Sequence, residues 1–343
     1  MEPRMPVGSD STGKFSPLVE ELSPGPSEFT LGLLWGSHLG DQLCLTPLPR
    51  LLKTAFGTRV YVNDTPVNRA IFKHNPYVEG FRRTPRTFHK LVAKGYGHHI
   101  QRLARGFGVA FEGDPKPEVY LTDEERQWAL RERTKWRRDR PVCIFSLRAL
   151  SSQGYYQRVD WHAVGGAWMK WCTAVQPVLT TVSAYTREVF PLSRRHREEW
   201  RPEHVLAGAV VYENLTLRQY MSLFSVADYF CGVLSGGAHV AAAFGLPSLV
   251  IVWRDLFSRL RLPSCENGHI GHCYTSHVYI SCDMLYYGQV NDAYLEECVW
   301  KVRCCQAERH AGGQMSIGSV VPTRVAMRLI KTERGRIVRM PTI

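Results

Sequence analysis

The sequence has no apolar run approaching the length of a membrane span, no Asp-x-Asp pair and no paired Cys-x-x-Cys motif. A helix that crosses a bilayer needs about 20 consecutive apolar residues, so no segment is predicted to span one. The missing Asp-x-Asp pair removes the usual carboxylate anchor for a cation that holds a diphosphate. Without paired Cys-x-x-Cys spacings there is no strong zinc pattern either, and we predict no metal site.

Residues 1–27 also lack the apolar stretch of a secretory signal, and they hold several Pro, Gly and Ser residues. We expect this segment to be a flexible leader. The ten cysteines are scattered. Four of them lie inside apolar runs, where buried thiols are common: Cys44, Cys143, Cys172 and Cys231. Together these features predict reduced thiols and a cytoplasmic protein.

The chain of 343 residues is longer than one hydrophobic core usually grows, so we expect two domains. Its formal net charge of +12 favours an anionic partner. Nucleotide phosphates, a phosphorylated glycolipid, an anionic membrane face and nucleic acid all carry such charge. Nucleic acid is the weakest candidate, because no binding module accompanies the basic residues.

Two distant segments share one local plan of apolar strand, small-residue loop and helix. In the first, Phe29–Trp35 is a predicted strand, the residues up to Gly40 form a loop, and Asp41–Phe56 is a helix that ends before Gly57. A further strand, Arg59–Asn63, is predicted to follow.

Two prolines interrupt this first predicted helix. With Thr46 as an N-cap, Pro47 and Pro49 both fall in a first turn, where a missing N–H costs little. We therefore expect the helix to bend or restart there.

In the second segment, Thr216 and Gln219 have the spacing of a capping box at the start of a helix with an apolar stripe. Tyr229–Val233 is then a predicted strand, and a small-residue loop leads into a short helix, Ala238–Phe244. Alternating strands and helices predict an α/β fold with parallel sheets. Further strands are predicted over Val142–Leu147, Val178–Val182 and Ser248–Trp253, and a helix with a linker over Glu124–Arg140.

The second loop, Ser235–His239, joins the carboxyl end of a strand to the start of a helix. Such a turn gathers unpaired backbone N–H groups and the positive end of the helix dipole, which together favour phosphate. Its small residues let a ligand approach, Ser235 offers a hydroxyl, and His239 offers a further donor. The alternative is a glycine-rich turn whose histidine is satisfied inside the protein.

Asp41 also has two interpretations. It is either an N-terminal cap for the amides of its helix or a carboxylate on the rim of an interdomain cleft that takes a proton from an acceptor hydroxyl. Its position at the end of a helix favours the ionised form that a base needs.

Three segments, in the same order along the chain, carry a resemblance to one protein family. Gly40–Lys53 (GDQLCLTPLPRLLK) resembles the N-terminal signature of glycosyltransferase family 9, the lipopolysaccharide heptosyltransferases. Phe72–Val78 (FKHNPYV) is similar to the segment that follows in that family. Thr216–Pro247, centred on SGGAHVAAA, resembles its donor-site segment. The resemblance therefore extends over most of the chain.

This resemblance implies an α/β fold of the GT-B type, with two Rossmann-like domains and an interdomain cleft. It implies inverting, metal-independent transfer of a heptose or similar sugar, without a cofactor, from a nucleoside-diphosphate donor to a hydroxyl of an anionic glycan or glycolipid. ADP-heptose is one candidate donor. Asp41 is implied as the general base. The implied donor-binding residues are Ser235, Gly236, Gly237 and His239.

Two positions depart from the family pattern. Leu234 stands where the family usually has an aspartate, and Arg158 is the nearest equivalent of a lysine near the donor phosphates. Arg158 supplies the positive charge with a different geometry, so it joins the donor-binding candidates. Leu234 supplies no carboxylate, which favours the alternative of a non-catalytic GT-B scaffold that binds a nucleotide or a glycan.

A basic run extends from Arg82 to Arg105 in the expected acceptor domain. It is either a solvated charged face or a docking surface for a phosphorylated glycolipid or an anionic membrane. Arg82, Arg83 and Arg86 are its acceptor-binding candidates.

A second cluster is rich in cysteine and histidine: Cys265, His269, His272, Cys273, His277 and Cys282. Some related autotransporter heptosyltransferases carry a metal-binding cysteine finger in this region. The spacings here match no strong zinc pattern, so we expect an ordinary loop near the cleft.

The expected organisation is a leader at 1–27, an acceptor-binding domain at 28–139, a nucleotide-sugar domain at 140–330 and a basic tail at 331–343. The chain is expected to be a cytoplasmic transferase of lipopolysaccharide biosynthesis, in peripheral contact with the inner membrane.

Overall fold

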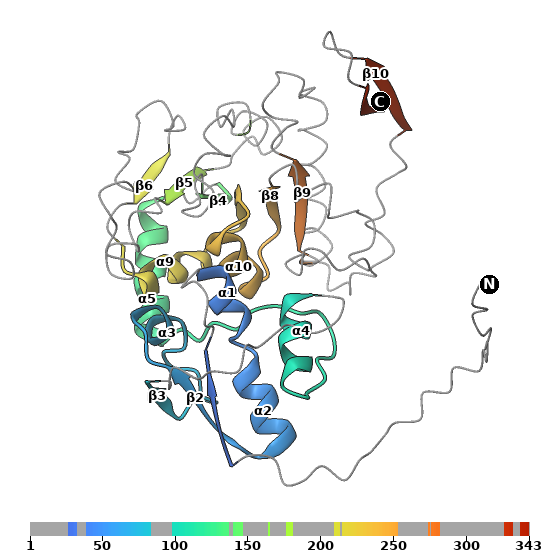
Figure 1. Cartoon of the computed structure of the whole chain (residues 1–343). Helices are drawn as coiled ribbons and strands as arrows, with labels where there is room; N and C mark the ends of the chain where they lie inside the picture. The colour runs from blue at the N-terminus through green and yellow to red at the C-terminus, as the bar shows by residue number, and fades with distance from the viewer. Residues whose placement is uncertain are drawn as a thin grey trace, which may run out of the picture.

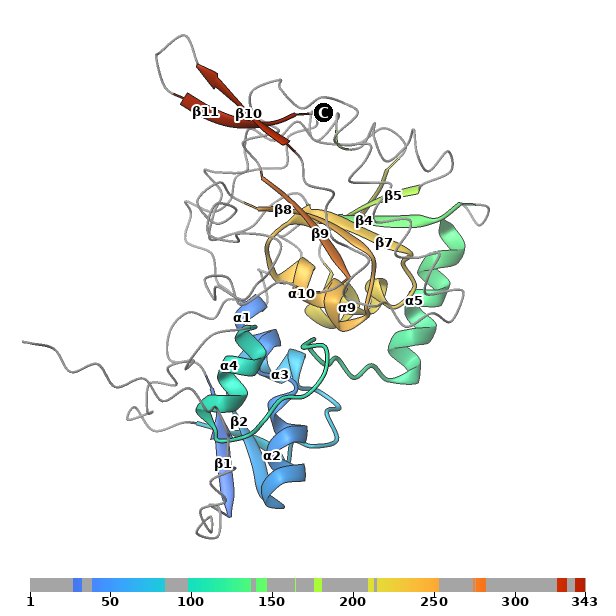
Figure 2. The same ribbon diagram turned by 90° about the vertical axis from the view of Figure 1, so that its right-hand side faces the viewer.

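The computed structural model describes residues 27–32, 39–83, 98–136, 140–146, 164, 176–180, 209–212, 215–252, 274, 276–281, 326–331 and 337–342. Within these ranges the chain is α/β, and its two larger sheets are both parallel. The elements of the N-terminal half, blue and cyan, pack against those of the C-terminal half, yellow and orange (Figures 1 and 2). No helix in the described part has both the length and the apolar character needed to cross a bilayer.

The N-terminal half contains a parallel sheet with the strand order β1-β2-β3. Its strands are β1 (Glu28–Leu31), β2 (Arg59–Asn63) and β3 (Gly80–Arg82). Its helices are α1 (Leu39–Cys44), α2 (Leu48–Phe56), α3 (Pro66–Ile71) and α4 (His99–Gly106). Strand β2 coincides with the strand predicted after Gly57.

The first predicted helix is divided into α1 and α2, as its two prolines suggest. Helix α1 begins at Leu39, so Gly40 is helical rather than part of a loop. The prediction of Thr46 as N-cap is wrong, because Pro47 occupies that position and the Thr46 hydroxyl donates instead to a carbonyl of α1 (2.7 Å). Gly57 ends α2, as predicted, and it has the left-handed conformation (φ 62°).

The C-terminal half contains a six-stranded parallel sheet with the order β6-β5-β4-β7-β8-β9. This is the Rossmann order, in which the chain changes direction at a switch point between β4 and β7. The strands are β4 (Val142–Ser146), β5 (Gln176–Thr180), β6 (Val210–Tyr212), β7 (Tyr229–Val233), β8 (Ser248–Val252) and β9 (His277–Ser281). The predicted strands at β4, β7 and β8 are confirmed, and β5 lies two residues earlier than predicted.

Three described helices accompany this sheet: α5 (Asp123–Lys135), α9 (Leu217–Phe224) and α10 (Gly236–Ala243). The capping box at the start of α9 is confirmed, since Thr216 accepts from the amide of Gln219 (3.1 Å) and Gln219 accepts from that of Thr216 (2.9 Å). Strands β10 (Ala326–Lys331) and β11 (Ile337–Thr342) form an antiparallel hairpin, so the segment expected as a basic tail contains a strand.

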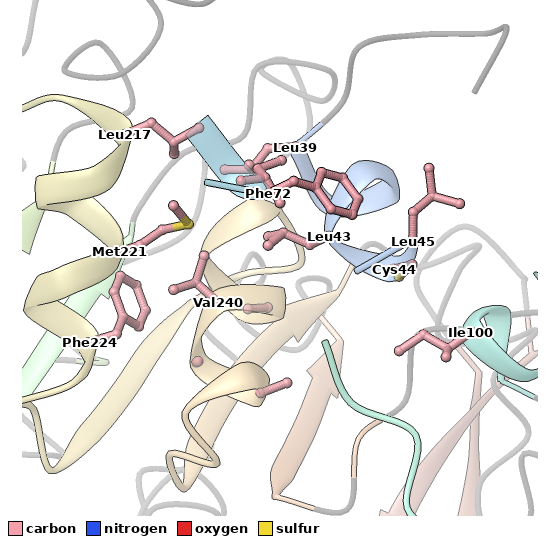
Figure 3. Close-up of a cluster of buried hydrophobic side chains, with 14 of the residues drawn as sticks. Leu39, Leu43, Cys44, Leu45, Phe72, Ile100, Leu217, Met221, Phe224 and Val240 are labelled. Atoms are coloured by element: carbon pink, nitrogen blue, oxygen red, sulfur yellow. The ribbon is translucent and has the colours of Figure 1, made fainter. Parts of the chain in front are cut away.

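The buried apolar core is continuous between the two halves. Leu39 and Leu43 of α1 lie beside Val240 of α10 and Met221 of α9 (Figure 3). Cys44, Cys143 and Cys231 are buried as thiols, as predicted, whereas Cys172 lies outside the described residues. The first turns of α1 and α10, which are far apart along the chain, are thus held together by apolar packing.

Candidate functional site

Helices α1 and α10 meet through a reciprocal pair of glycines. A Cβ atom placed on Gly40 would lie 2.5 Å from Cδ2 and 2.7 Å from Nε2 of His239. A Cβ atom on Gly236 would lie 2.5–2.9 Å from the side chain of Leu39. Each helix therefore places one side chain on a glycine of the other. The two predicted motifs are in direct contact, which their positions in the sequence do not reveal.

The turn before α10 follows β7, at the carboxyl edge of the sheet and beside the switch point between β4 and β7. Ligands of open α/β sheets bind at this location. Ser235 is the N-cap of α10, but its side chain makes no capping hydrogen bond. Its Oγ is buried and has no hydrogen-bond partner among the described residues. A ligand oxygen at this helix start would satisfy both the hydroxyl and the first helix amides.

Gly236 and Gly237 were predicted as small residues that let a ligand approach. The structure gives a further reason for glycine here, because Leu39 occupies the space beside Gly236. A Cβ on Gly237 would lie 2.7 Å from the hydroxyl of Tyr220. Both glycines are therefore required by contacts inside the protein.

Asp41 is the third residue of α1 and is half-buried. His99 is the first residue of α4. Burial lowers the pKa of His99, and the negative charge of Asp41 partly opposes this lowering. Burial raises the pKa of the Cys44 thiol one turn later, to which the charge of Asp41 adds. The predicted base is thus near enough to His99 for its charge to act on that residue, and it is one residue from the glycine that touches His239.

His239 is buried, and its imidazole lies against Gly40 of α1. Its Nδ1 lies 2.5 Å from the hydroxyl of Tyr274 and 3.8 Å from Sγ of Cys44. Burial, reinforced by the nearby histidines His98 and His277, lowers the pKa of His239 to about 3, so the ring is neutral near pH 7. The imidazole therefore sits inside the contact between α1 and α10, rather than at the amides of the turn.

The rings of two more histidines, His98 and His277, lie beside that of Tyr274. His98 is the N-cap of α4, and its Nδ1 accepts from the amide of Ile100 (3.2 Å). Burial lowers the pKa of His98 to about 3. Nε2 of His277 lies 2.9 Å from the carbonyl of Ala238 in α10, to which it donates, since a carbonyl only accepts.

A second contact between the halves centres on Arg218 of α9, which is 9% exposed. Its guanidinium makes a bidentate ion pair with Glu125 at the start of α5. It also donates to the carbonyls of Ala70 at the end of α3 (3.2 Å) and Tyr120 (2.6 Å). One buried cation therefore joins three segments of the chain.

The acceptor-binding candidates are described only in part. Arg82 stacks on the ring of Tyr61 (3.2 Å to the centroid) and pairs with Glu28 at the opposite end of the sheet (2.5 Å), so its charge is drawn away from the carboxyl edge. Arg83 is exposed. Arg86 lies outside the described residues, as does the donor-site candidate Arg158.

Of the Cys- and His-rich cluster, only His277 is described. No group of three or more His, Cys, Asp or Glu residues in the described ranges has an arrangement that would hold a metal ion. Leu234, which replaces the family aspartate, is half-buried and packs against the apolar core.

Sequence reasoning missed Tyr274, His98 and Arg218. An available signal for Arg218 was a cation within an otherwise apolar helix, and for His98 a polar residue three positions before Gln101. Tyr274 carried no local signal, because its importance comes only from what the fold brings around it.

No family model matches this sequence, and no curated protein matches it. Similarity is found among solved structures. ADP-heptose LPS heptosyltransferase II of E. coli is 13% identical with a TM-score of 0.56, and the match covers 82% of this chain and 99% of that one. A family 9 glycosyl transferase from Veillonella parvula is 10% identical with a TM-score of 0.55, covering 81% and 97%. The iron-containing dodecameric glycosyltransferase TibC of enterotoxigenic E. coli is 14% identical with a TM-score of 0.51, covering 82% and 76%. The chain shares the fold of these heptosyltransferase-like enzymes.

Proposed function

We propose that this chain is an inverting, metal-independent glycosyltransferase that moves a heptose or similar sugar from a nucleoside diphosphate to a hydroxyl group. One observation carries the proposal: the turn with Asp41 touches the turn with Ser235, beside the switch point of a Rossmann sheet. A carboxylate and an anion-binding helix start, on separate halves of the chain, are the two groups that such a transfer requires.

The proposed reaction is a single displacement. The Asp41 carboxylate takes the proton of the acceptor hydroxyl, and the acceptor oxygen forms a bond to the anomeric carbon. The bond between that carbon and the diphosphate breaks, and the nucleoside diphosphate leaves with the electron pair. The amides at the start of α10 and the Ser235 hydroxyl stabilise the charge that develops on the leaving group.

The proposal includes a GT-B arrangement, with an acceptor-binding domain at 28–139, a donor-binding domain at 140–330 and a cleft between them. Arg83 and Arg86 are retained as candidates for an anionic acceptor or membrane surface, and Arg158 for the donor phosphates. Because Arg82 is engaged by Glu28 and Tyr61, it becomes the weakest acceptor candidate. ADP-heptose is the first donor to test, because the E. coli enzyme that shares the fold is an ADP-heptose transferase. A cytoplasmic location in peripheral contact with a membrane would fit the basic run.

The alternative is a scaffold that binds a nucleotide without transferring sugar. The packing of Leu234 against the core favours it, because a leucine offers no carboxylate to the sugar. Both proposals require nucleotide binding at Ser235, and only the first requires turnover.

Two N-cap residues provide a matched test of the nucleotide site. We expect Ser235→Ala to weaken ADP binding roughly tenfold or more, because a hydrogen bond to a charged phosphate contributes roughly 1.5–3 kcal/mol. It should leave the free energy of unfolding unchanged, since the hydroxyl makes no capping bond. Thr216→Ala removes a cap that does bond its helix and should cost about 1 kcal/mol of stability without changing ADP affinity.

Isothermal calorimetry measures the ADP affinity of both variants, and denaturant unfolding measures their free energies of unfolding. Equal ADP affinity in the wild type and Ser235→Ala would place the diphosphate away from this turn. The same measurement with other nucleoside diphosphates identifies the base.

A further inference from the structure

Tyr274 lies at the centre of the contact between the two halves. It precedes β9, is 4% exposed and touches elements of both halves. Its hydroxyl lies 2.5 Å from Nδ1 of His239 and 3.8 Å from Sγ of Cys44. Its ring lies 4.8 Å from that of His98, between ring centroids. One side chain therefore contacts α1, α4 and α10.

The position of Tyr274 limits the freedom of His239. On one side, the imidazole is held at Nδ1 by the tyrosine hydroxyl. On the other, its Cδ2 and Nε2 atoms lie against the backbone of Gly40, where no Cβ would fit. The ring is a spacer of fixed orientation between α10 and the turn that carries Asp41.

A second residue near Tyr274 also contacts α10. His277, three residues after Tyr274, donates from Nε2 to the carbonyl of Ala238 in the first turn of α10 (2.9 Å). Ser276 lies 3.0 Å from the other ring nitrogen of His277, which it fixes in place. Tyr274 and His277 therefore both hold α10, the first through His239 and the second through the Ala238 carbonyl.

We propose that Tyr274 is a positioning residue for glycosyl transfer: by holding His239 against Gly40, it sets the distance between the Asp41 carboxylate and the donor-binding turn at Ser235. This inference rests on the function proposed above. Tyr274 touches neither substrate in this account and acts through His239. A displacement of about 1 Å between reacting groups is enough to lower a rate roughly a hundredfold.

Tyr274→Phe tests the proposal, because it removes only the hydroxyl and keeps the ring. Tyr212→Phe is the matched control: its hydroxyl also makes two hydrogen bonds, to Trp136 and Glu132, but on β6 and away from α1 and α10. Three quantities are measured in both variants: hydrogen–deuterium exchange of residues 39–44 and 236–243, ADP affinity, and turnover of ADP-heptose.

For Tyr274→Phe we expect faster exchange in both peptides, ADP affinity within about twofold of wild type, and turnover lowered roughly tenfold or more. Tyr212→Phe should change none of these. A purely structural role for Tyr274 would lower turnover and ADP affinity together in Tyr274→Phe, without separating the two.

Unchanged exchange in both peptides would overturn the positioning role, as would faster exchange with unaltered turnover. If the wild type itself turned over no ADP-heptose or other nucleotide sugar, the proposed transfer would fail instead. The exchange data would still decide whether Tyr274 holds the two turns together, so the two failures are distinguishable.

Discussion

Two contacts in this protein, that of α1 with α10 and that of α9 with α3 and α5, are built from different kinds of interaction. The contact of α1 with α10 uses glycines, a leucine and a neutral imidazole, so it consists mainly of van der Waals packing. The contact of α9 with α3 and α5 uses Arg218, whose charge is matched by Glu125 and two backbone carbonyls.

The two contacts therefore differ in the free energy that is lost when each is disrupted. Parting α1 from α10 exposes apolar surface and neutral rings, at a cost roughly proportional to area, about 25 cal/mol per Å². Removing one partner of the Arg218–Glu125 pair would leave the other charge buried and unpaired, which costs about 3–5 kcal/mol. The account therefore predicts that the two contacts respond differently to mutation and to pH.

The largest expected effect is at the charged contact. Arg218→Met keeps most of the side-chain length but leaves Glu125 and two carbonyls without their donor, and should lower the free energy of unfolding by about 3–5 kcal/mol. Arg69→Met is the matched control, because Arg69 also makes a bidentate pair, with Asp64, but its side chain is 60% exposed. It should lose little stability. Similar losses in both variants by urea unfolding would contradict the distinction.

The next effect in size is the response to acid, which should weaken only the contact of α1 with α10. His98 and His239 have pKa values of about 3 when folded, against 6.5 ordinarily, so the unfolded chain takes up protons first as the pH falls below 6.5. Their stabilisation is complete above that pH, and about 2 kcal/mol per histidine is lost at about pH 5. Protonated His98 would also lose its cap on α4, because Nδ1 would no longer accept.

The charged contact should persist through this range. Burial alone would raise the pKa of Glu125, but hydrogen bonds from Arg218 and the Thr122 amide outweigh it and lower the pKa below 4.5. Its contribution is therefore lost only at more acidic pH. Hydrogen–deuterium exchange at about pH 7.5 and about pH 5 should show α1 and α10 opening while α5 and α9 stay protected.

Two histidine variants sharpen the acid prediction. His98→Asn keeps a side-chain oxygen that caps α4 and removes one of the two titrating groups. It should therefore lose only about half as much free energy of unfolding at about pH 5 as the wild type. His74→Asn is the control: His74 is exposed with φ 64°, a conformation that asparagine tolerates. A free energy of unfolding that does not change between the two pH values in the wild type would count against neutral His98 and His239 in the folded protein.

A smaller effect is expected from one methyl group. Gly40→Ala should cost about 1–3 kcal/mol, because the new Cβ would lie 2.5 Å from a histidine ring that Tyr274 holds in place. The sign of the change in stability is diagnostic, because replacing a glycine inside a helix by alanine ordinarily stabilises a protein by about 0.5–1 kcal/mol. Gly80→Ala, whose new Cβ would have no neighbour closer than 3.8 Å, should be nearly neutral. Stabilisation by Gly40→Ala in thermal unfolding would show that α1 and α10 are not in contact in solution.

Local sequence patterns predicted the parts of the fold that depend on local chemistry. Strands β2, β7 and β8 are short apolar runs bounded by turns, and Thr216 with Gln219 marks the start of α9 directly. The start of α1 was predicted two residues too late, because glycine has a low helix propensity. Gly40 is helical in the structure, and its missing side chain leaves room for the His239 ring.

The site was predictable only in part, for the same reason. Asp41 and Ser235 follow from turn chemistry, but the contact that joins their helices depends on residues nearly two hundred positions apart. His239 was expected to donate to a phosphate, and the structure directs its imidazole to Tyr274. The charge on Arg82 was predicted to face an acceptor, but it pairs with Glu28 at the opposite end of the sheet. Such competing partners are invisible without the fold.

The most direct test of the central claim is the turnover of Asp41→Asn, with ADP-heptose as the first donor. Asparagine keeps the volume and the hydrogen-bond acceptor at the start of α1 but takes up no proton, so turnover should fall by a factor of roughly 10² to 10⁴. The melting temperature and ADP affinity should stay at their wild-type values, as should every property of the control Asp123→Asn in the first turn of α5. Near-wild-type turnover in a folded, ADP-binding Asp41→Asn protein would contradict the account and leave Asp41 as a structural residue.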